Sequence, residues 1–106
     1  IVSTTKPLEL IHMDLCGPMR IQSRSRKRYV LVIVDDYSRY TWVIFLTSKD
    51  ETYDEFLVFA KRVQNLSGHK IMHIRSDHGK EFENYKFDDL SRDNGLDHNF
   101  SAPRTP

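Results

Sequence analysis

The chain is 106 residues long, 39% of its residues are hydrophobic, and its formal net charge is +1. This length supports one domain with a real apolar core, and the small charge does not by itself indicate a nucleic-acid-binding protein. The single cysteine, Cys16, excludes an internal disulfide and a zinc site built from several thiolates. The longest apolar run, residues 29–34, is too short to span a bilayer, so we expect no membrane partner.

Three strands are predicted in the first half of the chain. Residues 8–15 alternate imperfectly between apolar and polar side chains and end before Gly17-Pro18. Residues 29–37 are β-branched and apolar on both faces, which is typical of a central strand. Residues 41–48 form the third strand, and the short turn before it predicts a hairpin with the second.

A well-marked helix should follow. Ser48 and Glu51 have the spacing of a capping box, and Gly68 is placed to end the helix. Its apolar positions follow the helical period: Tyr53, Phe56, Leu57, Ala60, Val63 and Leu66. Five large aromatic side chains are predicted to lie in the core: Trp42, Phe45, Phe56, Phe59 and Phe82.

The remaining elements are shorter. Residues 70–77 predict a strand, residues 82–95 a weaker second helix ending at Gly95, and residues 96–101 a last strand. The resulting order, βββαβαβ, predicts an α/β fold in which a mixed sheet led by a hairpin carries helices packed against it. Several α/β folds share this order, and the ribonuclease H-like fold is one of them.

Two acidic residues stand out because a strand is a costly place for a carboxylate. Asp14 interrupts the first strand, and Asp77 comes at the end of the fourth strand, just before Gly79. Ligands gather at strand ends in open α/β sheets, so both carboxylates can converge if the two strands are neighbours. Converging carboxylates repel each other and favour a hard cation such as Mg²⁺ or Mn²⁺. The alternative is structural: each Asp caps a turn or pairs with an arginine such as Arg75.

A second acidic pair, Asp35-Asp36, has a simpler interpretation. It precedes the turn of the hairpin, where Asp side chains accept hydrogen bonds from nearby backbone N–H groups. Arg39 can pair with either carboxylate. We therefore predict a structural role for both.

Histidines and basic residues supply candidate contacts to a nucleic acid. His78 neighbours Asp77 and can touch a phosphate or a metal-bound water, or it is simply a polar loop residue. His12 shares the face of Asp14, two residues away. Five cations fall in nine residues after the first strand: Arg20, Arg24, Arg26, Lys27 and Arg28. They can neutralise phosphates, with Lys80, Lys61 and Arg62 extending the patch, or they form an ordinary solvated face.

Four segments together resemble a known family. The stretches "HMDLCGPM", "VIVDDYSRYTWVIFL", "IRSDHGKEF" and "FSAPRTP" are similar, in this order and spacing, to the integrase catalytic core of copia-type LTR retrotransposons. The match runs from about residue 8 to residue 106. The resemblance implies a ribonuclease H-like fold and polynucleotidyl transfer by an Asp, Asp, Glu triad.

The resemblance assigns roles to particular residues. The two Asp positions of the triad fall on Asp14 and Asp77, which would be catalytic and metal-binding, while Asp36 matches a family position outside the triad. The cofactor would be Mg²⁺ or Mn²⁺, with two ions in the complete domain. Six residues are the candidate nucleic-acid contacts: Arg24, Arg26, Lys27, Arg28, His78 and Lys80.

The resemblance also implies partners and a setting. DNA would be the substrate, both as element ends that are trimmed at the 3′ end and as the target of strand transfer. A homodimer or higher oligomer of a longer polyprotein product is expected, in the nucleus or in a cytoplasmic virus-like particle.

The third carboxylate departs from the pattern. The family places that Glu on a helix after the "SAPRTP" turn, with which this sequence stops, and Glu81 and Glu83 are too near Asp77 to replace it. We therefore interpret residues 1–106 as a partial core that lacks the C-terminal part of the fold, with residues 1–7 as linker, and expect the chain alone to be inactive. Whether it is an enzyme stays open at this point. The alternative is a non-catalytic or domesticated retroelement remnant that binds nucleic acid or protein.

Overall fold

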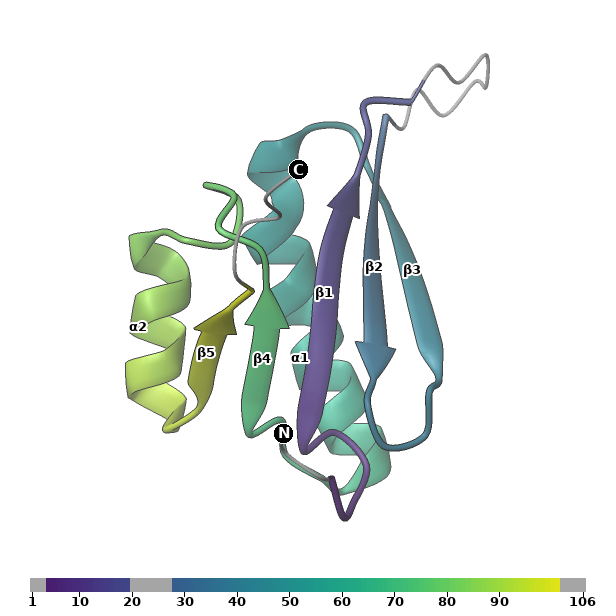
Figure 1. The fold of residues 1–106 in the computed structure, drawn as a ribbon, viewed down its shortest axis with the longest axis vertical. Coiled ribbons are helices and arrows are strands. Elements are labelled where there is room, and N and C mark those ends of the chain that lie inside the picture. The colour runs from purple at the N-terminus through teal and green to yellow at the C-terminus, as the bar shows by residue number, and fades with distance from the viewer. Residues whose placement is uncertain (1–3, 20–27, 102–106) are drawn as a thin grey trace.

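The computed structural model describes residues 4–19 and 28–101 and shows one mixed sheet with helices on one of its faces (Figure 1). The strands are β1 (Leu10–Cys16), β2 (Tyr29–Asp35), β3 (Thr41–Leu46), β4 (His73–Ser76) and β5 (Asp97–Phe100). The helices are the 3₁₀ turn η1 (Lys49–Glu51), α1 (Thr52–Ser67) and α2 (Tyr85–Asn94). The predicted order βββαβαβ is confirmed.

The sheet has the strand order β3-β2-β1-β4-β5. The first three strands pair antiparallel, which confirms the hairpin of β2 and β3, whereas β4 pairs parallel to both β1 and β5. The first strand is therefore central, with the last two on one side of it. Because β1, β4 and β5 run in the same direction, their C-terminal ends lie at one edge of the sheet (Figure 1).

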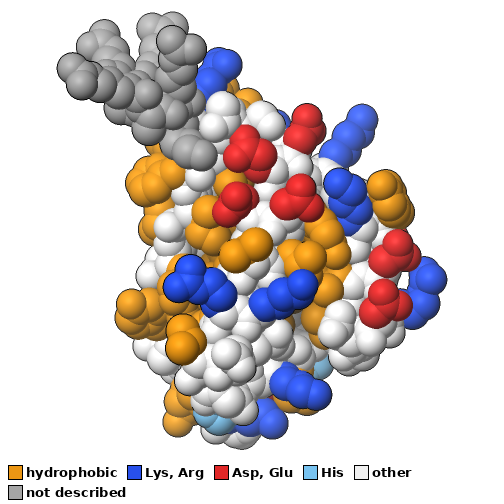
Figure 2. Space-filling view, turned by 180° about the vertical axis from the view of Figure 1, so that it is seen from behind, with side chains coloured by type: hydrophobic (Ala, Val, Ile, Leu, Met, Phe, Trp, Pro, Cys, Tyr) orange, Lys and Arg blue, Asp and Glu red, His pale blue; other side chains and the backbone are white. Residues whose placement is uncertain are grey.

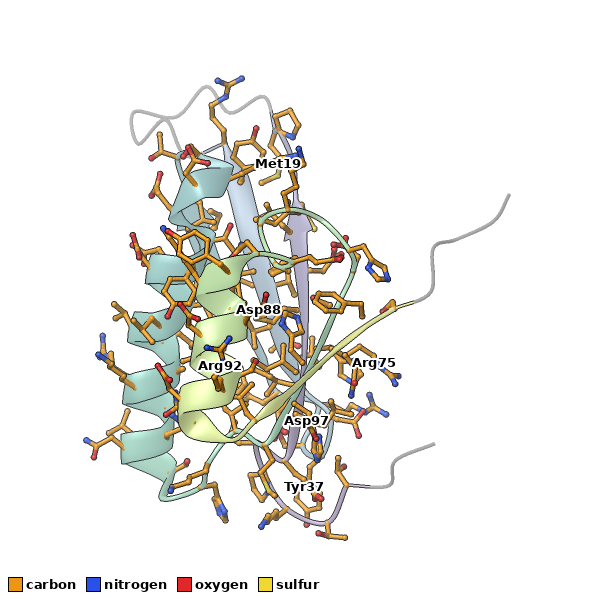
Figure 3. The ribbon with its side chains drawn as sticks, turned by 90° about the vertical axis from the view of Figure 1, so that its left-hand side faces the viewer. Met19, Tyr37, Arg75, Asp88, Arg92 and Asp97 are labelled. Carbon is orange, nitrogen blue, oxygen red and sulfur yellow. The ribbon has the colours of Figure 1, made fainter. Side chains whose placement is uncertain are left out.

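The pleat of each strand separates a helix-covered face from a helix-free face. Ile11 and Met13 of β1 are buried in the core, while Asp14 between Met13 and Leu15 is exposed on the other face. In Figure 3 both α-helices lie on one side of the sheet, and Arg75 lies on the opposite side. The core cluster joins the covered face to the helices through Leu8, Ile11, Met13, Leu31, Ile33, Leu46, Phe56, Ala60, Ile71, Ile74, Phe82 and Phe87.

The helix boundaries follow the signals in the sequence. The Ser48 capping box is present, and the Glu51 carboxylate accepts the Ser48 N–H at 2.9 Å. Asn84 caps α2, because its Oδ1 accepts the N–H groups of residues 86 and 87. Both α-helices end at a glycine with positive φ, Gly68 at 74° and Gly95 at 64°.

One of the five aromatic residues predicted to lie in the core is not there. Phe45 is 55% exposed, because β3 directs Trp42, Ile44 and Leu46 toward α1 and its alternate residues to the helix-free face. Leu66, one of the apolar positions at the helical period, is 80% exposed in the last turn of α1. Within the described residues, none of the helices is long and apolar enough to cross a membrane.

Candidate functional site

Asp14 and Asp77 come from neighbouring parallel strands at the same edge of the sheet. Residues 10, 11 and 12 of β1 pair with residues 73, 74 and 75 of β4. Continued by two residues, this register brings Asp14 level with Asp77, the first residue after β4. Both residues are exposed. The condition set from the sequence, that the two strands be neighbours, is met.

The hydrogen bonds of the two carboxylates are few. Asp77 Oδ1 accepts the Gly79 N–H at 2.9 Å, so this side chain does cap a turn with one of its oxygens. Asp14 Oδ2 lies 3.9 Å from the Cys16 Sγ. Within residues 4–19 and 28–101, neither carboxylate forms an ion pair, and Arg75 pairs with neither. Two exposed carboxylates are thus left with oxygen lone pairs to offer.

The Cys16 thiol is affected by the neighbouring acid. Its pKa is raised above the ordinary value, first by partial desolvation and then by the negative charge of Asp14, which disfavours a thiolate. Cys16 is exposed and unbonded to another cysteine. A raised pKa argues against a nucleophilic role, because the thiolate is the reactive form.

The donor set fits part of a site for a hard cation. Carboxylate oxygens are the ligands that Mg²⁺ and Mn²⁺ prefer, and Asp14 and Asp77 supply two such groups. Among the residues that the structure describes, no group of three or more His, Cys, Asp or Glu residues is arranged to hold a metal. The described chain therefore offers a pair of carboxylate ligands and not a full set.

The Asp35-Asp36 pair is structural, as predicted. Asp35 is only 2% exposed, and its carboxylate accepts the Leu8 N–H at 3.1 Å and the Ser38 hydroxyl at 2.7 Å. These bonds compensate for burying the charge and close the turn of the hairpin.

Asp36 is bound to the first strand. Its Oδ1 lies 2.9 Å from His12 Nε2 and 3.6 Å from Arg39 Nη1, and its Oδ2 accepts the Thr4 hydroxyl at 3.0 Å. The hydrogen bond from His12 is the largest cause that lowers the pKa of Asp36, and Thr4 and the Arg39 charge act in the same direction. His12 therefore serves Asp36, although it shares a face with Asp14.

Three side chains near Asp77 form contacts that the sequence did not reveal. His78 Nδ1 lies 2.6 Å from Glu83 Oε2, and the His78 ring stacks on Phe100 of β5. The sequence excludes Glu83 as a third metal ligand by its spacing from Asp77 and indicates no other role for it. The one sequence signal is the spacing of His78 and Glu83 across a glycine-containing loop, which does not identify a pair.

A half-buried histidine supports the same end of the sheet. His98 Nε2 lies 2.7 Å from Ser76 Oγ, and the Ser76 hydroxyl is 3.1 Å from the Asp77 carbonyl oxygen. Burial lowers the pKa of His98, with the charges of Asp88 and Glu83 opposing that shift. These polar contacts connect β5 to Asp77, the candidate metal ligand.

The comparisons with known proteins agree with this geometry. The family model "Integrase core domain" matches residues 4–106. The chain belongs to the integrase core domain family. It is 35% identical over 99 residues to the retrovirus-related Pol polyprotein from transposon TNT 1-94 of Nicotiana tabacum, and 34% identical over 105 residues to that from transposon RE2 of Arabidopsis thaliana. The resemblance to copia-type elements is confirmed.

The fold of this integrase core is that of retroviral integrase cores. Its structure is similar to the HTLV-2 integrase catalytic core domain in complex with magnesium, in a trimeric form, with a TM-score of 0.69, 21% identity, and coverage of 90% of this chain and 60% of that chain. The dimeric form of the same domain gives a TM-score of 0.67. The predicted ribonuclease H-like fold is confirmed. The two alignments include 93% and 99% of this chain. They include only 8% of the TNT 1-94 polyprotein and 7% of the RE2 polyprotein, so the chain spans a small part of either relative.

The predicted nucleic-acid contacts of the integrase core are only partly described. Arg24, Arg26 and Lys27 lie outside the described residues, whereas Arg28 and Lys80 are exposed. Lys61 and Arg62 belong to α1 on the helix-covered side, so they are not neighbours of Asp14. Figure 2, which views the molecule from behind, shows acidic side chains gathered above several basic ones.

Proposed function

We propose that this integrase core carries out metal-dependent polynucleotidyl transfer on DNA, with Asp14 and Asp77 as ligands of Mg²⁺ or Mn²⁺. The observation that carries the proposal is the matched register of two exposed carboxylates that have no cationic partner within the described chain. Such a pair is unfavourable by itself, because like charges repel, and becomes favourable when a divalent cation lies between them.

The chemistry divides between the ion and the protein. When bound, the ions would stabilise the charge that develops on the phosphoryl oxygens and at the attacking and leaving oxygens. The chain's own contribution is to hold Asp14 on a rigid central strand and to orient Asp77 through the Gly79 N–H. Rigid elements and fixed rotamers are what a transfer reaction needs to align its reactants.

Magnesium is supported by the ligand type and by the HTLV-2 integrase core, which was solved in complex with it. The two reactions that follow from the family are trimming of element 3′ ends and their joining to target DNA. Because the described residues supply two carboxylates and no third, we further propose that the 106-residue chain alone does not catalyse strand transfer.

The DNA path is proposed to follow the edge that holds Asp77. Arg28, His78 and Lys80 are exposed there or beside it, and Arg24, Arg26 and Lys27, which lie outside the described residues, remain candidates from the sequence. Self-association is proposed from the dimeric and trimeric forms of the HTLV-2 domain. A nuclear or virus-like-particle setting stays a prediction of the resemblance.

The metal site is tested by NMR with the 106-residue chain. Mn²⁺ added to the ¹⁵N-labelled protein should broaden the amide signals around Asp14 and Asp77 first, and Mg²⁺ should shift the same signals. Asp14→Asn and Asp77→Asn should each weaken this binding at least tenfold. Asp36→Asn is the matched control, since Asp36 is bonded to His12 and should not bind the ion. Broadening centred elsewhere, or retained in both variants, would contradict the proposal.

A further inference from the structure

The His78–Glu83 pair lies immediately next to Asp77. His78 Nδ1 and Glu83 Oε2 are 2.6 Å apart, which is short for a hydrogen bond and typical of one that involves a charged acceptor. Both side chains are 50% exposed. The bond joins two ends of one short loop, so it has a local geometric role whatever else it does.

The loop that carries this pair is anchored to the core. The Gly79 carbonyl oxygen accepts the N–H groups of Phe82 at 2.9 Å and of Glu83 at 2.8 Å. Phe82 is completely buried. The backbone of Glu83 is therefore held by its hydrogen bond to Gly79 and by the buried Phe82 beside it. From this fixed position, the Glu83 carboxylate can restrain His78.

A second contact sets the plane of the imidazole ring. The rings of His78 and Phe100 are stacked, with centroids 5.0 Å apart and planes 23° apart. Phe100 is itself fixed, since it pairs with Ser76 in the sheet and contacts the His98 ring at 4.3 Å. Phe100 controls the plane and Glu83 controls rotation within it, so the ring has one favoured placement.

The hydrogen bond also determines which ring nitrogen carries the proton. An ionised carboxylate only accepts hydrogen bonds, so Nδ1 must be the N–H donor to Glu83. In the neutral ring Nε2 is then an acceptor, and no described residue bonds to it. As an acceptor, Nε2 can bind an O–H group that donates a proton. It cannot form a hydrogen bond with an ionised phosphate oxygen, which has no proton to donate.

We infer that Glu83 is a positioning residue that fixes His78 with its Nε2 as an acceptor for the hydroxyl group of a DNA 3′ end, or for a water molecule, held next to Asp77. The inference rests on the proposed function, in which such an O–H group is the attacking nucleophile. His78 is the residue that touches this group, and Glu83 acts through His78. The pairing adds an orienting contact to the two metal-ligand carboxylates.

The first test is the tautomer of His78 in the 106-residue chain. Long-range ¹H–¹⁵N spectra at pH 8 should show the Nδ1–H tautomer in the wild type. Glu83→Ala should shift the population toward Nε2–H, and Glu83→Gln should restore Nδ1–H, because the amide oxygen still accepts. Glu81→Ala is the matched control, a carboxylate removed two residues away. An unchanged tautomer in Glu83→Ala would overturn the inference.

The second test compares DNA duplexes that end in a 3′-hydroxyl or in a 3′-deoxy sugar, with binding measured by fluorescence anisotropy in Mg²⁺ at pH 8. The wild type should prefer the hydroxyl end by about threefold to tenfold, the range that one hydrogen bond gives. His78→Ala and Glu83→Ala should lose this preference, while Glu83→Gln and Glu81→Ala keep it. Equal binding of both duplexes by the wild type would overturn the inference alone. Failure to bind either duplex would contradict the proposed function and the hydroxyl contact with it.

Discussion

The molecule has two pairs of aspartates whose environments are opposite. Asp35 and Asp36 bind nearby groups, including a backbone N–H, a serine hydroxyl and the His12 ring. Asp14 and Asp77 are exposed, and within the part of the chain that the structure describes only the Gly79 N–H donates a backbone hydrogen bond to either of them. The difference teaches that a carboxylate whose bonds are all supplied by the fold is structural, whereas exposed carboxylates with few such bonds are candidates for binding a ligand.

The largest effect that tests this comparison should come from Asp35. Asp35→Ala removes the acceptor for the Leu8 N–H and the Ser38 hydroxyl from a site that is 2% exposed, and leaves the buried Leu8 N–H without a partner. We expect the free energy of unfolding to fall by about 2–4 kcal/mol. Urea denaturation followed by circular dichroism measures this. A loss below about 0.5 kcal/mol would mean that the turn closes without the carboxylate.

Asp14→Asn and Asp77→Asn should behave in the opposite manner. Without metal, each should change the free energy of unfolding by no more than about 0.5 kcal/mol, because no ion pair of the described chain is lost. Added Mg²⁺ should stabilise the wild type, measured by thermal unfolding, and not the variants. Strong destabilisation by Asp14→Asn in the absence of metal would assign Asp14 to the structural class.

The support beneath Asp77 should respond to pH through His98. Its pKa is lowered from the ordinary 6.5 by burial, so the folded chain resists a proton that the unfolded chain accepts. The stabilisation that comes from keeping His98 neutral is therefore fully present above about pH 6.5. The free energy of unfolding declines as the pH falls below that value. Thermal unfolding between pH 8 and pH 5 should show this decline, and His98→Gln should reduce it. A melting temperature that rises toward pH 5 would contradict the burial argument.

A modest effect, also dependent on pH, is expected at Asp36. Its pKa is lowered from 3.8, chiefly by the His12 hydrogen bond, so its contribution to stability is present above that pH and is lost as the pH falls through the lowered value. Asp36→Asn should cost at most about 1 kcal/mol at pH 7, because the partners are partly exposed. Denaturation at pH 7 and pH 3 measures the difference, which should shrink at the lower pH.

Much of the fold was predictable because local signals and the global arrangement agree. The capping box at Ser48, the glycine after each helix and the apolar run of β2 each mark their elements correctly. The prediction that Phe45 lies in the core was wrong. A β-strand buries alternate residues, and the hydrophobicity of Phe45 does not show which face of the sheet is covered.

The candidate site was predictable only in part. Asp14 and Asp77 stood out because each is costly where the chain places it, and their adjacency followed once the strands proved to be neighbours. The His78–Glu83 bond and the Phe100 stacking could not be predicted, since they depend on the conformation of one loop and on the register of β5.

The parallel pairing of β1 with β4 has a consequence for how the chain folds. The two strands are separated along the chain by a hairpin and a long helix, so pairing them closes a long loop at a cost in chain entropy. The neighbouring strand ends that carry Asp14 and Asp77 are therefore not yet assembled in a chain that has formed only the hairpin and α1. Ion binding during refolding would accordingly report the docking of the fourth strand.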